Sequence, residues 1–154
     1  MDILSIILTN TYSINQLKHR LGLLKTYLEG QIFGIEKPIP QTDPWINALD
    51  KNLLSGFNKD NLTLTFENLH TQIASLEVLT LYLTFEPDET TLTQLGEYVR
   101  KTFNRMVLLD TKYDPNLIAG AALVWKGLYK DFSLRSKIEE KKGEILTSFQ
   151  AFLR

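Results

Sequence analysis

The chain contains no cysteine, and this absence excludes several kinds of chemistry. Without a thiol, the chain can form no disulfide bond, use no cysteine nucleophile and build no metal site from sulfur ligands. Its two histidines, His19 and His70, lie about fifty residues apart, each in a segment with amphipathic helical periodicity. Neither has an acid or a second histidine at a spacing typical of a zinc site. We therefore expect neither a metal site nor a cofactor.

The chain also lacks an excess of either charge and any long apolar run. It has 17 Lys and Arg against 18 Asp and Glu, with a formal net charge of −1. This balance provides no general attraction to nucleic acids or anionic membranes. No apolar run approaches the roughly 18 residues that a membrane-spanning helix needs. We expect no nucleic-acid partner and no direct insertion into a membrane.

Recognisable catalytic constellations are missing as well. Ser55-Gly56 and Gly120 do not stand in the contexts of a nucleophile elbow or a phosphate-binding loop. Glu86, Asp88 and Glu89 form an acidic cluster, but they precede a predicted helix, whose N-terminus negative charge stabilises. We predict that the protein is not an enzyme and has no catalytic residue. A small α/β enzyme or ligand-binding protein with an unrecognised site is the alternative.

The first half of the sequence has helical periodicity. In residues 12–33, an apolar stripe recurs at spacings of three and four and consists of Ile14, Leu17, Leu21, Leu24 and Leu28. A second stripe of this kind occupies residues 62–76. Between the two, three of the five prolines fall in residues 34–44 and mark a loop, which a short helix follows. Residues 1–77 are thus predicted to form a small helical bundle.

The second half, residues 78–154, changes to strand-like composition. The predicted elements are, in order, a strand over 78–85, a helix over 92–103, a strand over 106–113, a strand over 117–125, a returning strand over 128–130 and a helix from 134 onwards. Lys126-Gly127 predicts the turn of a hairpin, because glycine readily adopts the positive φ that such turns need. The predicted fold class is α+β: a small N-terminal helical bundle followed by a C-terminal mixed β-sheet with two helices.

Two short strings stand out in this second half. The first is D-P-N-L-I-A-G, residues 114–120, and the second is D-F-S-L-R-S-K-I, residues 131–138. Gly120, which we expect within a strand, would permit a bulge or the close approach of a neighbouring helix. Asp131 and Ser133 can accept hydrogen bonds from the free amides at the start of the last helix. These roles are structural, and none of them requires a substrate.

In this order and spacing, the strings resemble the C-terminal half of the delta subunit of F-type ATP synthases, the oligomycin-sensitivity-conferring protein of mitochondria. The resemblance covers residues 78–146. The residues that fall on the family's pattern are Asp114, Pro115, Leu117, Ile118, Gly120, Asp131, Ser133 and Arg135. Ala119 stands where the family usually has the first of two glycines. Residues 1–77 are shorter than the family's six-helix bundle and contain no string that aligns with it.

The resemblance implies a non-catalytic connector in the peripheral stalk of a rotary ATP synthase. Its partners would be the alpha subunits of the catalytic head and the helices of the stator b-subunits. Its location would be cytoplasmic, peripheral to the inner face of a bacterial plasma membrane. The stalk E-type subunit of a vacuolar or archaeal ATPase is an alternative. Candidate partner-binding residues are Leu17, Leu21, Leu24, Trp125, Ile145, Phe149 and Phe152.

Overall fold

The computed structural model describes residues 3–34, 44–47, 49–50 and 54–153. The chain divides into two compact units, Met1–Glu77 and Val78–Arg154. The first unit is helical, and the second contains a mixed sheet with helices, so the predicted α+β fold class is confirmed. Residues 35–43, most of the segment in which the prolines predict a loop, lie outside the described residues.

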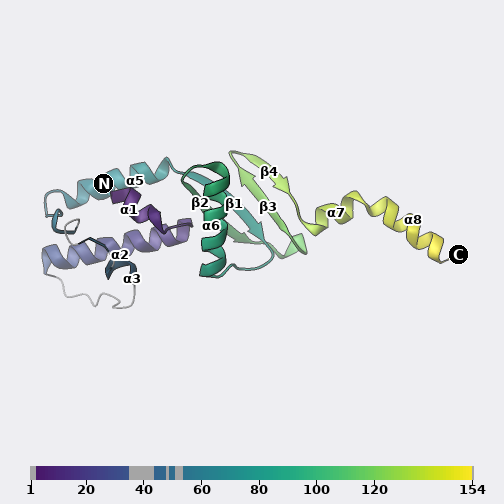
Figure 1. The fold of residues 1–154 in the computed structure, drawn as a ribbon, viewed down its shortest axis with the longest axis horizontal. Helices are drawn as coiled ribbons and strands as arrows, with labels where there is room; N and C mark the ends of the chain where they lie inside the picture. The colour runs from purple at the N-terminus through teal and green to yellow at the C-terminus, as the bar shows by residue number, and fades with distance from the viewer. Residues whose placement is uncertain (1–2, 35–43, 48, 51–53, 154) are drawn as a thin grey trace. The chain divides into compact units, whose positions relative to one another are not determined.

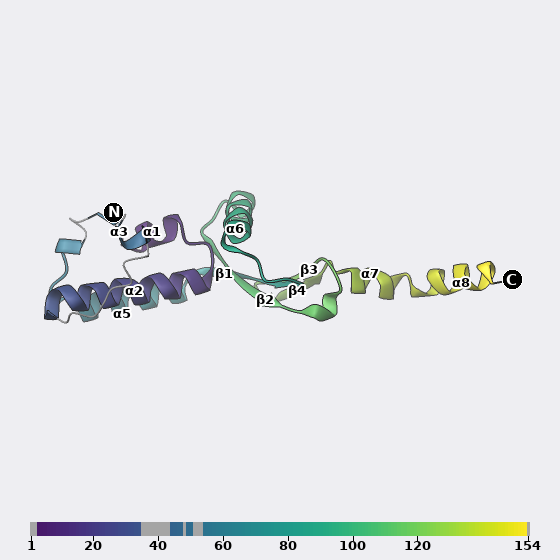
Figure 2. The same cartoon turned by 90° about the horizontal axis from the view of Figure 1, so that it is seen from below.

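Helices form the N-terminal unit. They are α1 (Ile3–Thr9), α2 (Ile14–Phe33), α3 (Pro44–Asn47) and α5 (Leu62–Ala74). Helix α1 lies against α2, and α5 runs along the same bundle (Figure 1, Figure 2). The core of this unit includes Leu4, Ile7, Leu8, Leu17, Leu21, Leu24, Leu28, Ile46, Leu49, Leu62, Phe66 and Leu69. The two predicted apolar stripes therefore supply most of the core.

A capping box begins α2. The Ser13 side chain accepts a hydrogen bond from the Gln16 amide at 3.1 Å, and the Gln16 side chain accepts one from the Ser13 amide at 3.2 Å. The helix ends at Gly34, which adopts a left-handed conformation with φ 64°. The capping box satisfies amides that a helix cannot pair internally, and a left-handed glycine is a common end for a helix.

The second unit is built on a four-stranded sheet. Its strands are β1 (Glu77–Leu83), β2 (Val107–Tyr113), β3 (Ala121–Trp125) and β4 (Leu128–Asp131), in the order β2-β1-β3-β4. Strand β3 pairs antiparallel with both β1 and β4. Trp125 stands opposite Leu128, which leaves Lys126 and Gly127 as a two-residue turn with φ angles of 49° and 79°. Two positive φ angles are typical of a type I′ hairpin turn, which confirms the predicted reversal.

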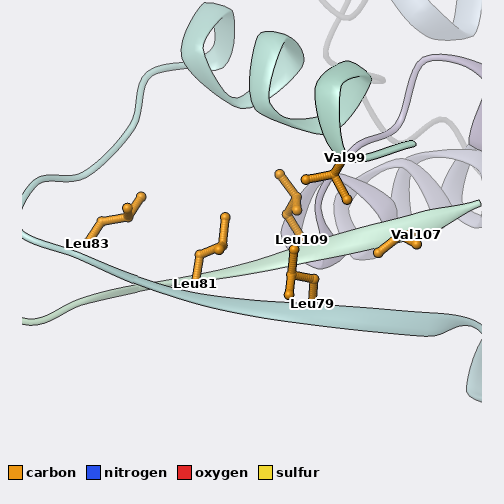
Figure 3. Packing of buried hydrophobic residues seen from close by; sticks show 6 residues of the cluster. All are labelled: Leu79, Leu81, Leu83, Val99, Val107 and Leu109. Carbon is orange, nitrogen blue, oxygen red and sulfur yellow. The ribbon is translucent and has the colours of Figure 1, made fainter. Parts of the chain in front are cut away.

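Helix α6 (Glu89–Phe103) covers one face of this sheet (Figure 3). Strands β1 and β2 and the helix contribute to one buried cluster, made of Leu79, Leu81, Leu83, Val99, Val107 and Leu109. Asp88 caps α6 by accepting a hydrogen bond from the Thr91 amide at 2.9 Å. Hydrogen bonding from Thr91 also holds the pKa of Asp88 below its ordinary value. Asp88 is therefore the N-cap of α6, which accords with the acidic cluster expected before this helix.

The prediction of a third strand starting at Leu117 was wrong. Pro115–Leu117 form a short 3₁₀ helix, η1, and β3 begins only at Ala121. Between them, Ile118 has φ 67° and ψ −55°, and the Ala119 amide donates to the Leu117 carbonyl at 2.8 Å. This geometry is that of a γ-turn, which is strained and rare for a β-branched residue. Gly120 accordingly precedes the strand instead of lying inside it.

The last predicted helix is divided in two. Helix α7 spans Leu134–Glu140 and α8 spans Lys142–Phe152, with Lys141 between them at φ −96° and ψ 7°. The Lys141 amide donates to the Lys137 carbonyl, and the Ile145 amide donates to the Lys141 carbonyl. Lys141 therefore ends one helix and begins the next, with a break in helical geometry between them.

Candidate partner-binding site

The two strings meet in space at the start of α7. The Phe132 amide donates to the Ala121 carbonyl at 2.9 Å, and the Leu134 amide donates to the Ala119 carbonyl at 2.8 Å. Gly120 has φ +87°, and a Cβ atom placed on it would lie 2.8 Å from the Phe132 carbonyl oxygen. Because that contact is with backbone, it could not be relieved by a side-chain rotation. The predicted close approach at Gly120 is confirmed, and its partner is the segment that enters α7.

Side-chain caps complete this junction. Ser133 is fully buried, and its hydroxyl accepts a hydrogen bond from the Ser136 amide at 3.2 Å. The Asp131 carboxylate accepts one from the Ser133 amide at 2.8 Å. Hydrogen bonding from Ser133 lowers the pKa of Asp131, and Tyr129 and Arg135 contribute in the same direction. The entry to α7 is thus fixed by both backbone and side-chain bonds.

The first string, residues 114–120, contributes η1, which lies next to this junction. Asp114 caps η1 by accepting hydrogen bonds from the Asn116 amide at 2.9 Å and the Asn116 side chain at 3.0 Å. Leu117 is buried, whereas Pro115 and Ile118 are exposed. Helix α7 contacts η1 directly. The residues on the motif pattern therefore form a structural base for α7, except that Arg135 points to Glu139 in an exposed ion pair of 3.0 Å.

Helices α7 and α8 expose their apolar side chains. Neither helix buries a single residue. The exposed fraction reaches 64% for Phe149 and 88% for Phe152. We call the exposed apolar set the C-terminal stripe, and it consists of Leu134, Ile138, Ile145, Leu146, Phe149, Phe152 and Leu153. Within α8 these side chains recur at intervals of three and four, so they share one face. This face can accept an amphipathic partner.

The other predicted partner-binding residues lie in different surroundings. Leu17, Leu21 and Leu24 are buried in the core of the N-terminal unit, so a partner would reach them only if that bundle opened. Trp125 is half-buried, and its ring lies 4.9 Å from that of Phe103, beside the core that α6 covers. Of the predicted set, Ile145, Phe149 and Phe152 are the ones that the structure places together on an exposed face.

Sequence reasoning missed several residues of this surface. Leu146 in α8 and Leu153 at its C-cap were not among the candidates, although they flank Phe149 at spacings of three and four. That spacing was a sufficient signal. In the N-terminal unit, the candidates also included none of the residues that line a hollow of about 380 Å³, which are Tyr27, Leu28, Gln31, Ile32, Leu54, Ser55 and Phe57. Its walls come from segments distant in sequence.

No group of three or more metal-binding side chains occurs within the part of the chain that the structure describes. Among the described helices, none is both long enough and apolar enough to cross a bilayer. A model of the ATP synthase delta (OSCP) subunit family matches residues 59–145. The chain belongs to this family. The resemblance of the two strings is therefore confirmed.

The delta (OSCP) family match includes α5, the whole sheet, α6 and α7, and it ends inside α8. Most of α8, with Leu146, Phe149, Phe152 and Leu153, lies beyond it. No curated protein sequence matches the chain. Members of the family are non-catalytic subunits of the peripheral stalk of ATP synthases.

Proposed function

We propose that this protein connects the catalytic head of a rotary F-type ATP synthase to its membrane-anchored stator. The family match supports the stalk assignment, and it favours the delta subunit over an E-type stalk subunit of a vacuolar or archaeal ATPase. The observation that carries the connector role is the C-terminal stripe, an exposed apolar face on helices that bury no residue. Such a face is typical of a surface that another helix covers.

The proposed stator contact lies on this stripe. A helix of the stator b-subunit would pack along α7 and α8, with Ile145, Phe149 and Phe152 inserted between its side chains. The junction at Gly120 suits this role, because force applied to α7 passes into β3 through main-chain hydrogen bonds. A connector that resists torque needs such a fixed base more than it needs polar catalytic groups.

The proposed contact with the head lies on the N-terminal unit. The hollow beside Tyr27 and Phe57 is large enough for apolar side chains from a helix of the head's alpha subunits. Lys59 lies 5.6 Å from the Phe33 ring near the end of α2, where an exposed aromatic side chain adds further apolar surface. The two partners would therefore bind separate units of the chain. In this role the protein would work in the cytoplasm, peripheral to the inner face of the plasma membrane.

Phe149→Asp tests the connector role directly. The substitution puts a charge in the middle of the C-terminal stripe, so we expect binding of a stator b-subunit peptide to be lost while head binding stays within a few-fold of wild type. Isothermal titration with each partner measures both affinities. Ser148→Asp, which introduces the same charge at a neighbouring exposed position outside the stripe, is the matched control.

Circular dichroism must show that both variants are folded. Unchanged stator-peptide affinity in a folded Phe149→Asp variant would mean that the stripe is not the stator site. The connector role itself is tested by pull-down of the native wild-type protein followed by mass spectrometry. Recovery of neither the head nor the stator subunits would overturn it.

A further inference from the structure

Two lysines interrupt the C-terminal stripe. Lys141 and Lys142 lie between Ile138, near the end of α7, and Ile145 in α8. Lys142 precedes Ile145 and Leu146 by three and four residues, so its side chain belongs to the same face as theirs. Both lysines are exposed, and neither has an ion-pair partner among the described residues. The stripe therefore contains a basic gap between two apolar parts.

The acidic residues of these helices are placed differently. On α8, Glu144 precedes Ser148 by four residues and lies on the face opposite Lys142, whereas Glu140 is the last residue of α7. Glu139 is engaged by Arg135 at 3.0 Å. On α8, Lys142 thus lies on the apolar face and Glu144 on the opposite one, while Lys137 adds a positive charge to α7 three residues before Glu140.

We infer that the C-terminal stripe docks an amphipathic helix that carries a carboxylate opposite Lys141 and Lys142, between its own apolar residues. This inference rests on the proposed function, since it describes the chemistry of the stator helix that would bind there. Apolar contacts with Ile145, Phe149 and Phe152 supply most of the affinity. The charge pair sets the register of the two helices, because only one alignment brings the carboxylate of the partner opposite the lysines.

A second copy of this chain fits the stripe poorly. In a parallel pair, Lys142 of one copy meets Lys142 of the other, and like charges repel at such short range. In an antiparallel pair, Lys142 would face either Lys142 or apolar residues of its partner. In both arrangements Glu144 lies on the opposite face of α8 from Lys142.

A lipid surface is also a poor fit. Helices that lie on membranes carry their lysines and arginines on the polar face, where the ammonium groups reach the lipid headgroups. Here Lys142 lies in the apolar face, and the polar face carries Glu140 and Glu144. Insertion of this stripe would bury a lysine among acyl chains and turn acids towards the headgroups.

Two synthetic peptides test the inference with the full chain. Both form amphipathic helices with a leucine seam, and they differ in one central seam residue, which is Glu in one and Gln in the other. We expect the Glu peptide to bind about three- to tenfold more tightly, and the difference to shrink as salt is raised. Fluorescence anisotropy at two salt concentrations measures both effects.

Substitutions in the chain identify the side chains that bind the carboxylate of the peptide. In a Lys141→Gln, Lys142→Gln double variant, the two peptides should bind equally, because the positive charge is gone. Glu140→Gln with Glu144→Gln is the matched control on the polar face, and it should keep the preference for Glu. Circular dichroism confirms that each variant is folded.

Three results would overturn the inference. The first is equal affinity of the wild-type chain for both peptides, or a preference that survives the double lysine substitution. The second is a dimer in sedimentation experiments that Phe149→Asp dissociates. The third is binding to phosphatidylglycerol vesicles that Phe149→Asp abolishes. If the two peptides bind equally but Phe149→Asp still prevents binding of the stator peptide, only this inference fails. If the stator peptide binds the Phe149→Asp variant as tightly as wild type, the proposed function fails instead.

Discussion

Helix α2 and the α7–α8 pair have apolar stripes of the same kind, but the chain covers only one of them. On α2, Leu17, Leu21, Leu24 and Leu28 recur at spacings of three and four and are all buried. The C-terminal stripe has the same spacing on α8, and all of its members are exposed. Helical periodicity therefore predicts that a face will be covered, and it does not predict whether the covering residues belong to the same chain.

The difference has an energetic consequence. Each buried leucine of α2 contributes roughly 1.5–3 kcal/mol to folding through the removal of its surface from water. The exposed side chains of α8 contribute little to folding of the isolated chain. Their apolar surface can instead be buried when a partner binds, and its burial would then stabilise the complex. The four predictions below test this contrast, beginning with the largest expected effect.

Leu24→Ala and Phe149→Ala compare the two stripes directly. Leu24 is 1% exposed, so its truncation leaves a cavity and should lower the free energy of unfolding by about 2–5 kcal/mol. Phe149→Ala removes a larger side chain from solvent and should change it by less than about 0.5 kcal/mol. Urea denaturation measures both. A costly Phe149→Ala would show that α8 packs on the rest of the chain in solution.

Gly120→Val tests how α7 is attached. The valine would have to adopt φ +87° and place its Cβ atom against the Phe132 carbonyl, which should cost roughly 1–3 kcal/mol. Ala119→Gly, at the neighbouring position, should cost under about 1 kcal/mol, because Ala119 has no positive φ and loses only a methyl group. Chemical denaturation that gives the reverse order would contradict this description of the junction.

Ser13→Ala and Ser133→Ala compare the caps of the two regions. Both serines are buried and accept a hydrogen bond from the amide three residues later. Each substitution should lower the free energy of unfolding by about 1 kcal/mol. Ser148→Ala, in the exposed helix, provides the neutral reference. If Ser133→Ala behaves like Ser148→Ala, then α7 is not held by its cap.

Asp131 makes the smallest expected contribution, and its effect depends on pH. Its pKa is lower in the folded chain than in the unfolded chain, because Ser133 hydrogen-bonds the carboxylate. The stabilisation is therefore present above the unfolded pKa and is lost as pH falls through the folded pKa. Asp131→Asn should be less stable than wild type at neutral pH, and the gap should close in acid. Urea midpoints across this range measure it, and a gap that persists in strong acid would contradict the assignment.

Much of the second unit could be predicted because its signals are local. Glycine at a two-residue turn, a capping aspartate before α6 and the alternation of the strands all depend on neighbouring residues. The γ-turn at Ile118 could not be predicted, since the intrinsic preference of isoleucine opposes positive φ. There the hydrogen bonds to the entry of α7 override local preference.

The placement of candidate residues was harder to predict for a similar reason. The ring of Trp125 contacts that of Phe103, which is 22 residues away in the sequence. The position of Trp125 next to a hairpin turn does not predict that contact. Leu21 and Phe149 look alike as members of amphipathic stripes, and only the arrangement of the other helices separates them. That residues 1–77 and 78–154 form two domains stays a prediction.

The junction at Gly120 determines which changes α7 can accept during evolution. Its direction is set by two main-chain hydrogen bonds, one glycine contact and the caps at Asp131 and Ser133, none of which uses an outward side chain of α7. The outward side chains of α7 can therefore be exchanged without turning the helix. Insertion or deletion of one residue within β3 or β4 would move the Phe132 and Leu134 amides out of line with the Ala121 and Ala119 carbonyls, and so would redirect α7. At this junction, segment length is constrained together with the identity of Gly120.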